Sequence, residues 1–213
     1  MRMIGKRNPF QCNYSVGFDD TGLLHAVKLD YYEDCGCSPS DSTGTMSMAL
    51  TICDNAYYCP NWLVTPYLAR TNLAANTACR APGVTPAVFF IEAIMDDIAR
   101  SLRLAPDTVR GINLYKKDQT TPYNQPLPYC SLDVLWPQAL SSFDYAARRA
   151  AADQFNRNNR WRKRGLSIAP QKLFLAVCCA CSSCCCTDIE AYACALTPIG
   201  MGWAGTARTS ARM

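Results

Sequence analysis

The sequence predicts an α+β fold in which a β-hairpin and short strands pack against helices. Three observations support this class. Apolar and polar residues alternate from Asn13 to Asp30, with turn residues between the two halves. Apolar residues recur at helical spacing from Pro86 to Leu102, and an alanine-rich amphipathic segment runs from Pro137 to Asn158. A chain of 213 residues, 49% of them hydrophobic, has enough apolar side chains to form a core.

The predicted hairpin turns at Asp19-Asp20-Thr21-Gly22, where Gly22 can adopt a positive φ angle. The first strand alternates through Tyr14, Val16 and Phe18. In the return strand, a period of two puts four side chains on one face: Leu23, His25, Val27 and Leu29.

Three helices are predicted in the first half of the chain. The first spans Thr43–Asp54. The second spans Pro86–Leu102, with Thr85 as its cap and an apolar stripe that leaves Glu92, Asp96, Asp97 and Arg100 outside. The third is a short helix over Pro106–Leu114, with Val109 and Ile112 turned inward.

The polar segment Lys116–Ser131 contains Pro122, Pro126 and Pro128, which favours a loop and a domain boundary. We therefore expect one domain over residues 1–115, a second over 116–175 and an irregular tail over 176–213. The basic segment Arg157–Arg164 could bind phosphate, but a solvated helix end explains it better.

Composition excludes several classes of protein. A net charge of +4, from 21 basic and 17 acidic residues, is too small to indicate a nucleic-acid partner. No apolar run reaches the roughly 18 residues needed to span a membrane. The first seven residues include three basic side chains and precede no apolar run, so we expect no signal peptide and a cytoplasmic location.

The cysteines and the single histidine give little support for a metal site or a nucleophile. Seven of the 14 cysteines lie between Cys178 and Cys194. Thiolates at such short spacing can bind zinc or an iron–sulfur cluster, but Cys178–Cys186 does not form clean C-x₂-C pairs, so metal binding is disfavoured. His25 lies in a predicted strand, where a structural role is favoured over a Ser–His or Cys–His pair.

Several segments, taken in order over residues 4–172, resemble the aldehyde oxidase and xanthine dehydrogenase family of molybdenum hydroxylases. The longest resembles the family's RTNxxSNTxFRGFG segment. The matching stretches are Ile4–Phe10, Val16–Phe18, Asp54–Tyr57, Arg70–Gly83, Asn113–Lys116 and Trp161–Leu166. The resemblance implies that the two predicted domains are parts of the family's molybdopterin-binding domains.

The resemblance also implies a reaction and its cofactors. Members hydroxylate aldehydes or electron-poor heterocycles with oxygen from water, using the molybdenum cofactor (molybdopterin), two [2Fe–2S] clusters and FAD, and they form homodimers. The family's catalytic glutamate and its iron–sulfur and flavin domains have no counterpart in this sequence. We therefore expect no catalytic residue here and a fragment that is inactive by itself.

Three residues match positions of the family's site. Arg80 matches an arginine that contacts the molybdenum cofactor, and a planar, permanently charged group suits its anionic surroundings. Met48 matches an arginine that steadies a purine oxygen in xanthine dehydrogenases, while Pro82 matches a phenylalanine that stacks on the substrate there. The Cys79-Arg80-Ala81-Pro82-Gly83 segment resembles insect-type aldehyde oxidases. Without the charge at Met48, apolar aldehydes or aromatic heterocycles are the favoured substrates; a core position for Met48 and a plain turn at Pro82 are the alternatives.

The composition changes abruptly after Ala176, where the family's own pattern ends. A frameshift, a retained intron or a faulty gene model would explain this break. Two further interpretations of the whole chain stay open: a non-enzymatic product, such as a truncated protein or decoy subunit, and a small cysteine-rich metal-binding protein.

Overall fold

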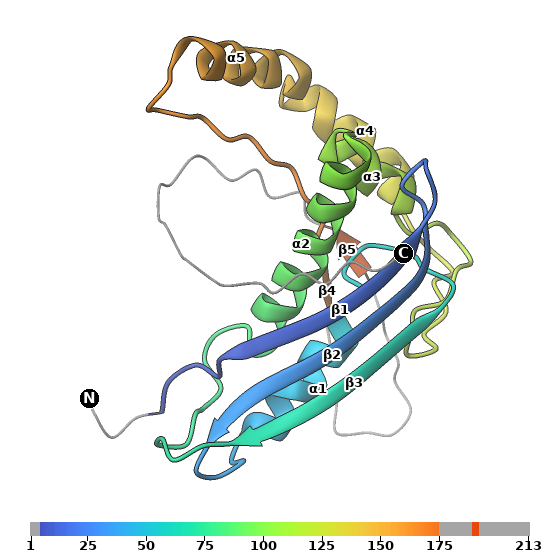
Figure 1. Cartoon of the computed structure of the whole chain (residues 1–213). Coiled ribbons are helices and arrows are strands. Elements are labelled where there is room, and N and C mark those ends of the chain that lie inside the picture. Colours follow the sequence, from blue (N-terminus) through green and yellow to red (C-terminus); the bar gives the residue numbers. More distant parts are fainter. Residues whose placement is uncertain (1–4, 175–188, 192–213) are drawn as a thin grey trace.

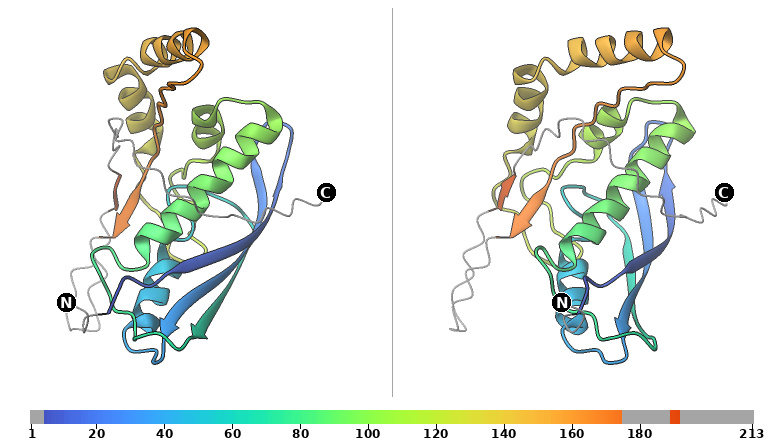
Figure 2. Two further views of the ribbon diagram at one scale, coloured as in Figure 1. Left: turned by 60° about the vertical axis from the view of Figure 1, so that its left-hand side comes forward. Right: turned by 90° about the vertical axis from the view of Figure 1, so that its left-hand side faces the viewer.

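A computed structural model describes residues 5–174 and 189–191 of the chain. Its centre is a three-stranded sheet formed by β1 (Phe10–Phe18), β2 (Leu24–Gly36) and β3 (Trp62–Arg70), in the order β1-β2-β3. β1 and β2 are antiparallel, whereas β3 runs parallel to β2. Helices α1 (Ser42–Ile52) and α2 (Val84–Leu102) lie on one face of this sheet (Figures 1 and 2). The predicted α+β class is confirmed.

The hairpin is confirmed, and its strands are longer than predicted. Gly22 has a φ of +88°, as the turn requires. The predicted buried face is wrong at its start, because Leu23 and His25 are exposed and Leu24 is buried. Phe18 pairs with Leu24 while Gly17 pairs with Ala26, so the register shifts at this point and His25 has no partner in β1. This bulge displaces the alternation by one residue.

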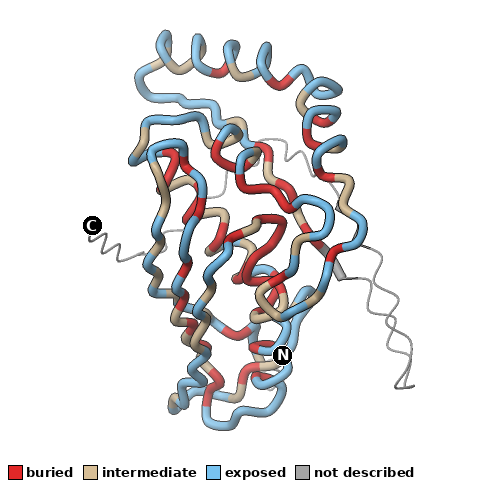
Figure 3. The backbone as a smooth tube through the Cα atoms, turned by 90° about the vertical axis from the view of Figure 1, so that its right-hand side faces the viewer, coloured by how far each residue is buried: buried red, intermediate tan, exposed pale blue. Residues whose placement is uncertain are grey.

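The main core lies between the sheet and α2. Ile91, Ile94, Met95 and Ile98 of α2 are almost completely buried. They pack in one cluster with apolar side chains of β2, such as Leu29, and Figure 3 shows buried segments gathered in this layer. The stripe predicted for this helix is therefore confirmed. Its cap is not Thr85 but Gly83, because the chain enters the helix through a positive φ of 71° that glycine tolerates.

α3 (Pro106–Asn113) confirms the third predicted helix, with one error in its buried face. Val109 is buried as expected, but Ile112 is 37% exposed. Arg110 and Asn113 are buried instead, each held by hydrogen bonds to other elements. The pattern of apolar residues could not predict the buried face of α3, because polar side chains form part of it.

The predicted helix Pro137–Asn158 is two helices, α4 (Leu132–Ser142) and α5 (Tyr145–Asn158). Asp144 separates them with a φ of +46°, a left-handed conformation that a right-handed helix cannot contain. Residues 116–131, which precede α4, contain no helix or strand, as predicted.

Two short strands, β4 (Lys172–Phe174) and β5 (Ile189–Ala191), pair antiparallel. β5 was not expected, because it falls in the tail predicted to be irregular. The rest of that tail, including the Cys178–Cys186 cluster, lies outside the described residues. Among the helices of the described part, none combines the length and apolar character needed to cross a membrane.

Candidate functional site

The loop of residues 71–83 connects β3 to α2 and carries Arg80 and Pro82. Hydrogen bonds attach it to the end of β2. The Thr71 amide donates to the Gly36 carbonyl over 2.9 Å, and the Cys37 amide donates to the Leu73 carbonyl, also over 2.9 Å. The Asn76 amide donates to the Cys35 carbonyl over 3.1 Å. The loop is therefore an extension of the sheet scaffold.

Two glycines, Gly36 and Gly83, allow close backbone contacts that fix the same loop on two further sides. A Cβ atom at Gly36, which has a φ of +73°, would lie 2.3 Å from the Ala74 carbonyl oxygen. A Cβ atom at Gly83 would lie 2.1 Å from the carbonyl oxygen of Thr45 in α1. Neither contact leaves room for a side chain. The loop is thus clamped between β2 and α1.

The predicted site residues lie on this loop and on the part of α1 that touches it. Arg80 is exposed, and within the described part of the chain its side chain forms no hydrogen bond or ion pair. Met48 is 39% exposed, so it is not the core methionine of α1; Met46 has that role, at 4% exposed. The Met48 Cβ atom lies 3.2 Å from the position of a Cβ built on Gly83, next to the half-buried Pro82. The structure therefore brings Met48 and the Pro82–Gly83 turn together.

His25 lies away from this loop, on the hairpin. Its Nε2 atom lies 3.3 Å from the Asp19 carboxylate, and its side chain is 57% exposed. Among the described residues, no group of three or more His, Cys, Asp or Glu side chains could hold a metal ion.

A buried cluster around Asp54, which follows α1 by two residues, was not predicted from the sequence. The Lys172 ammonium donates to the Asp54 carboxylate, and the Tyr115 hydroxyl donates to the same oxygen over 2.7 Å. The Lys172 ammonium also lies 5.1 Å from the ring centre of Tyr123. Burial raises the pKa of Asp54 and lowers that of Lys172, while the contact between them opposes both shifts.

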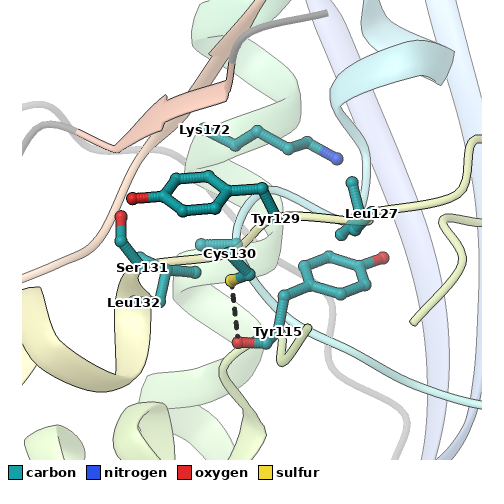
Figure 4. Close-up of a pocket in the computed structure, with 8 residues that line it drawn as sticks. Tyr115, Leu127, Tyr129, Cys130, Ser131, Leu132 and Lys172 are labelled. Carbon is teal, nitrogen blue, oxygen red and sulfur yellow. Dashed lines mark hydrogen bonds between the residues drawn. The ribbon is translucent and has the colours of Figure 1, made fainter. Parts of the chain in front are cut away.

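A small pocket opens beside this cluster (Figure 4). Two of its polar groups are already engaged: Lys172 binds Asp54, and the Cys130 thiol donates to the Tyr115 carbonyl over 3.2 Å. The rest of the lining is mainly apolar or aromatic, from Ala56, Tyr115, Leu127, Tyr129, Ser131 and Leu132. This arrangement joins Lys172 to Asp54, which directly follows the α1 region, and it presents no activated nucleophile.

A second buried cluster surrounds Arg110 of α3. Its Nε atom donates to the Glu92 carboxylate over 2.7 Å and its Nη2 atom to Asp96 over 2.8 Å. Glu92 also accepts from the hydroxyl of Tyr57 over 2.7 Å and from the amide of Asn55 over 3.0 Å. Glu92 was expected outside the helix stripe, but its side chain is only 15% exposed. A salt bridge across two helices leaves no signal in the helical period of either.

An anionic cofactor fits the loop better than either cluster. Asp54 and Lys172 neutralise each other, and Arg110 is held by two carboxylates. Arg80 instead presents a guanidinium on a fixed backbone with no acidic partner among the described residues. A charged donor set of this kind can bind phosphate or a similar oxygen-rich group.

Comparison with known proteins identifies the family of the chain. Residues 1–114 match the molybdopterin cofactor-binding domain family. The chain is 40% identical over 172 residues to xanthine dehydrogenase/oxidase of Gallus gallus, an alignment that covers 81% of this chain and 13% of that protein. It is 37% identical over 177 residues to aldehyde oxidase 4 of Cavia porcellus, covering 83% of this chain and again 13% of the relative.

Solved structures show the same fold. The aldehyde oxidoreductase of Desulfovibrio gigas superimposes with a TM-score of 0.70 at 23% identity, over 80% of this chain and 18% of that one. The enzyme from Desulfovibrio desulfuricans gives a TM-score of 0.71 at 24% identity over the same shares. The chain thus spans about 13% of the length of the curated relatives it matches. It belongs to the molybdopterin cofactor-binding domain family and corresponds to part of the molybdenum-binding region of these oxidoreductases.

Proposed function

We propose that this chain supplies one wall of the cofactor and substrate site of a molybdenum hydroxylase, of the aldehyde oxidase type. The observation that carries the proposal is Arg80, an exposed guanidinium without an acidic partner on a loop that is otherwise tightly fixed. The bound cofactor would supply the hydroxylation of an aldehyde or aromatic heterocycle with oxygen from water. Arg80 would hold and orient its anionic part through charge-assisted hydrogen bonds.

Met48 and Pro82 support the preference for aldehydes over purines. Both lie near Gly83, where α1 meets the loop. A thioether and a pyrrolidine ring offer no positive charge to a substrate oxyanion, and they form a soft, apolar surface. An uncharged aldehyde or aromatic heterocycle loses less free energy on leaving water for such a surface than a charged purine does.

The remaining parts of the proposal concern the longer protein of which such a domain is usually a segment. We propose that it contains [2Fe–2S] clusters and FAD, forms a homodimer and is cytoplasmic. We further propose that these 213 residues by themselves do not complete the catalytic site, because the glutamate that acts as the base in the resembling family has no counterpart among them.

The role of Arg80 can be tested by binding. Molybdopterin released anaerobically from a denatured molybdenum enzyme would be titrated into the purified chain and followed by pterin fluorescence. We expect weak binding by the wild type and a loss of about tenfold to a hundredfold in Arg80→Ala, since one charge-assisted contact contributes roughly 1.5–3 kcal/mol. Arg80→Lys should restore only part of the affinity, because an ammonium cannot bind in a bidentate way.

Arg148→Ala is the matched control, because Arg148 is also exposed but lies in α5, outside the basic segment Arg157–Arg164. It should bind like the wild type. A wild-type chain that binds no molybdopterin, or an Arg80→Ala chain that binds as tightly as the wild type, would contradict the proposal.

A further inference from the structure

We infer that Asp34 and Asn76 are positioning residues, which hold the backbone of the 71–83 loop so that Arg80 faces the cofactor in one orientation. The inference rests on the proposed role of Arg80. Asn76 lies in the loop itself and Asp34 at the end of β2. Neither is one of the predicted site residues, and neither is expected to touch the cofactor.

Asp34 connects the end of β2 to the start of the loop. Its Oδ1 atom accepts from the Gly36 amide over 2.8 Å and from the Thr71 hydroxyl over 2.8 Å. The pairing of β2 with β3 shifts register between Asp34 and Gly36, so the regular ladder is interrupted there. The carboxylate therefore replaces ladder hydrogen bonds at the point where the loop leaves the sheet.

Asn76 fixes the middle of the loop. It is 7% exposed, and its Nδ2 atom donates to the Asp34 carbonyl over 2.8 Å. The amide of the next residue, Thr77, donates to the carbonyl of Lys6 over 2.9 Å. The chain is thus held from both sides only three to four residues before Arg80.

The loop is also held directly after Arg80. The Ala81 carbonyl accepts from Arg7 over 3.5 Å, and Gly83 packs against the backbone of α1. Ala81 has a φ of +51°, an unfavourable conformation for alanine that the surrounding contacts must maintain. Arg80 therefore combines a free side chain with a backbone fixed on both sides. Such an arrangement lowers the ordering cost of binding, because only side-chain rotamers remain to be fixed.

Amide hydrogen exchange on the purified chain tests the clamp without any cofactor. The amides of Asn76 and Thr77 report opening of the loop, since both are hydrogen bonded to other segments. In Asp34→Ala we expect exchange at these amides to be about tenfold faster, given roughly 0.5–1.5 kcal/mol for each hydrogen bond lost. Asp34→Asn keeps the accepting oxygen and should exchange like the wild type.

Thr71→Val and Thr71→Ser form a second pair, in case Asp34→Ala fails to fold. Valine removes the donor to Asp34 and should accelerate exchange, while serine retains it and should not. Cys79, which is exposed and adjacent to Arg80, should in addition react with a thiol reagent at an altered rate only in the loosened variants. Exchange that is unchanged at Asn76 and Thr77, or equally faster in the core of α2, would overturn the inference.

Molybdopterin titration of the same variants separates this inference from the proposed function. If the inference is correct, Asp34→Ala and Thr71→Val bind more weakly, and Asp34→Asn and Thr71→Ser bind like the wild type. A loosened loop with unchanged affinity would overturn the positioning role. Failure of the proposed function would instead appear as unchanged affinity in Arg80→Ala.

Discussion

Two regions of the molecule are stabilised in different ways. The sheet with α1–α3 forms the body, and α4 and α5 form the arm. In the body, buried polar side chains bind partners far away in the sequence, as Asn113 does with Leu24. In α5, only Tyr145 and Ala152 are buried, and Figure 3 shows its outer surface largely exposed. The loop with Arg80 is attached to the body. The proposed site, which would hold a charged group in one orientation, thus lies on the part of the fold with the most long-range contacts.

Removing the lysine of the buried pair should give the largest loss of stability. In Lys172→Met, the fully buried Asp54 carboxyl loses its cationic partner, which costs roughly 3–5 kcal/mol. Urea unfolding followed by circular dichroism measures this change. The double variant Asp54→Asn with Lys172→Met should recover much of the loss, because no buried charge remains. A loss below about 1 kcal/mol in Lys172→Met would contradict the importance of this pair.

Replacing an asparagine by alanine in the body and in the arm should give the next largest difference in the free energy of unfolding. Asn113 accepts from the Leu24 amide and donates to the Gly22 and Val109 carbonyls, each over 2.8 Å. Asn113→Ala leaves these backbone groups without their partner and should cost about 2–3 kcal/mol in the free energy of unfolding. Asn158→Ala, at the exposed end of α5, should change stability by less than about 0.5 kcal/mol. Equal effects in the two variants would remove the distinction between body and arm.

The buried side chain of Glu33, in the body, should make the stability of the protein depend on pH. Its side chain is fully buried in β2, with no hydrogen-bond partner for either oxygen among the described residues. Burial raises its pKa from 4.5 to about 7. The folded state therefore favours the protonated form, so its contribution to stability is complete below pH 4.5 and is lost as the pH rises to about 7.

Glu33→Gln should remove this dependence. At pH 8 the variant should be more stable than the wild type by up to about 3 kcal/mol, and below pH 4 the two should be nearly equal. Denaturant unfolding at several pH values measures the difference. A stability difference that does not vary between pH 4 and pH 8 would show that Glu33 is not an ionisable buried group.

The smallest effect is expected in the arm. Ala150 is exposed in the middle of α5, so Ala150→Gly should cost at most about 1 kcal/mol through helix propensity. Hydrogen exchange should become faster in α5 and stay unchanged in α2. Faster exchange in both helices would show that the arm and the body unfold together.

The sequence predicted the elements whose pattern is apolar and regular. The hairpin and the long helix α2 are examples, since alternation and helical period follow directly from burial of one face. It could not show that Asp144 divides α4 from α5, because a left-handed residue in a polar segment interrupts no apolar pattern. The bulge at His25 was missed for a related reason: one extra residue changes the register without changing composition.

The candidate site divides in a similar way. Arg80, Met48 and Pro82 were selected by resemblance, and their roles stay predictions. The clamp by Asp34 and Asn76 and the clusters around Asp54 and Arg110 depend on contacts between distant segments. Lys172, for example, lies 118 positions from Asp54. A charged residue in a polar stretch looks the same in sequence whether it is solvated or buried in an ion pair.

The most direct test of the proposed function is the molybdenum content of the purified 213-residue chain, measured together with aldehyde-dependent reduction of a dye. If these residues form one wall of a site that other segments complete, the chain will contain far less than one molybdenum per molecule and will show no turnover. Molybdenum near one per chain, with turnover of an aldehyde, would contradict that account, because the residues described here would then build a complete site.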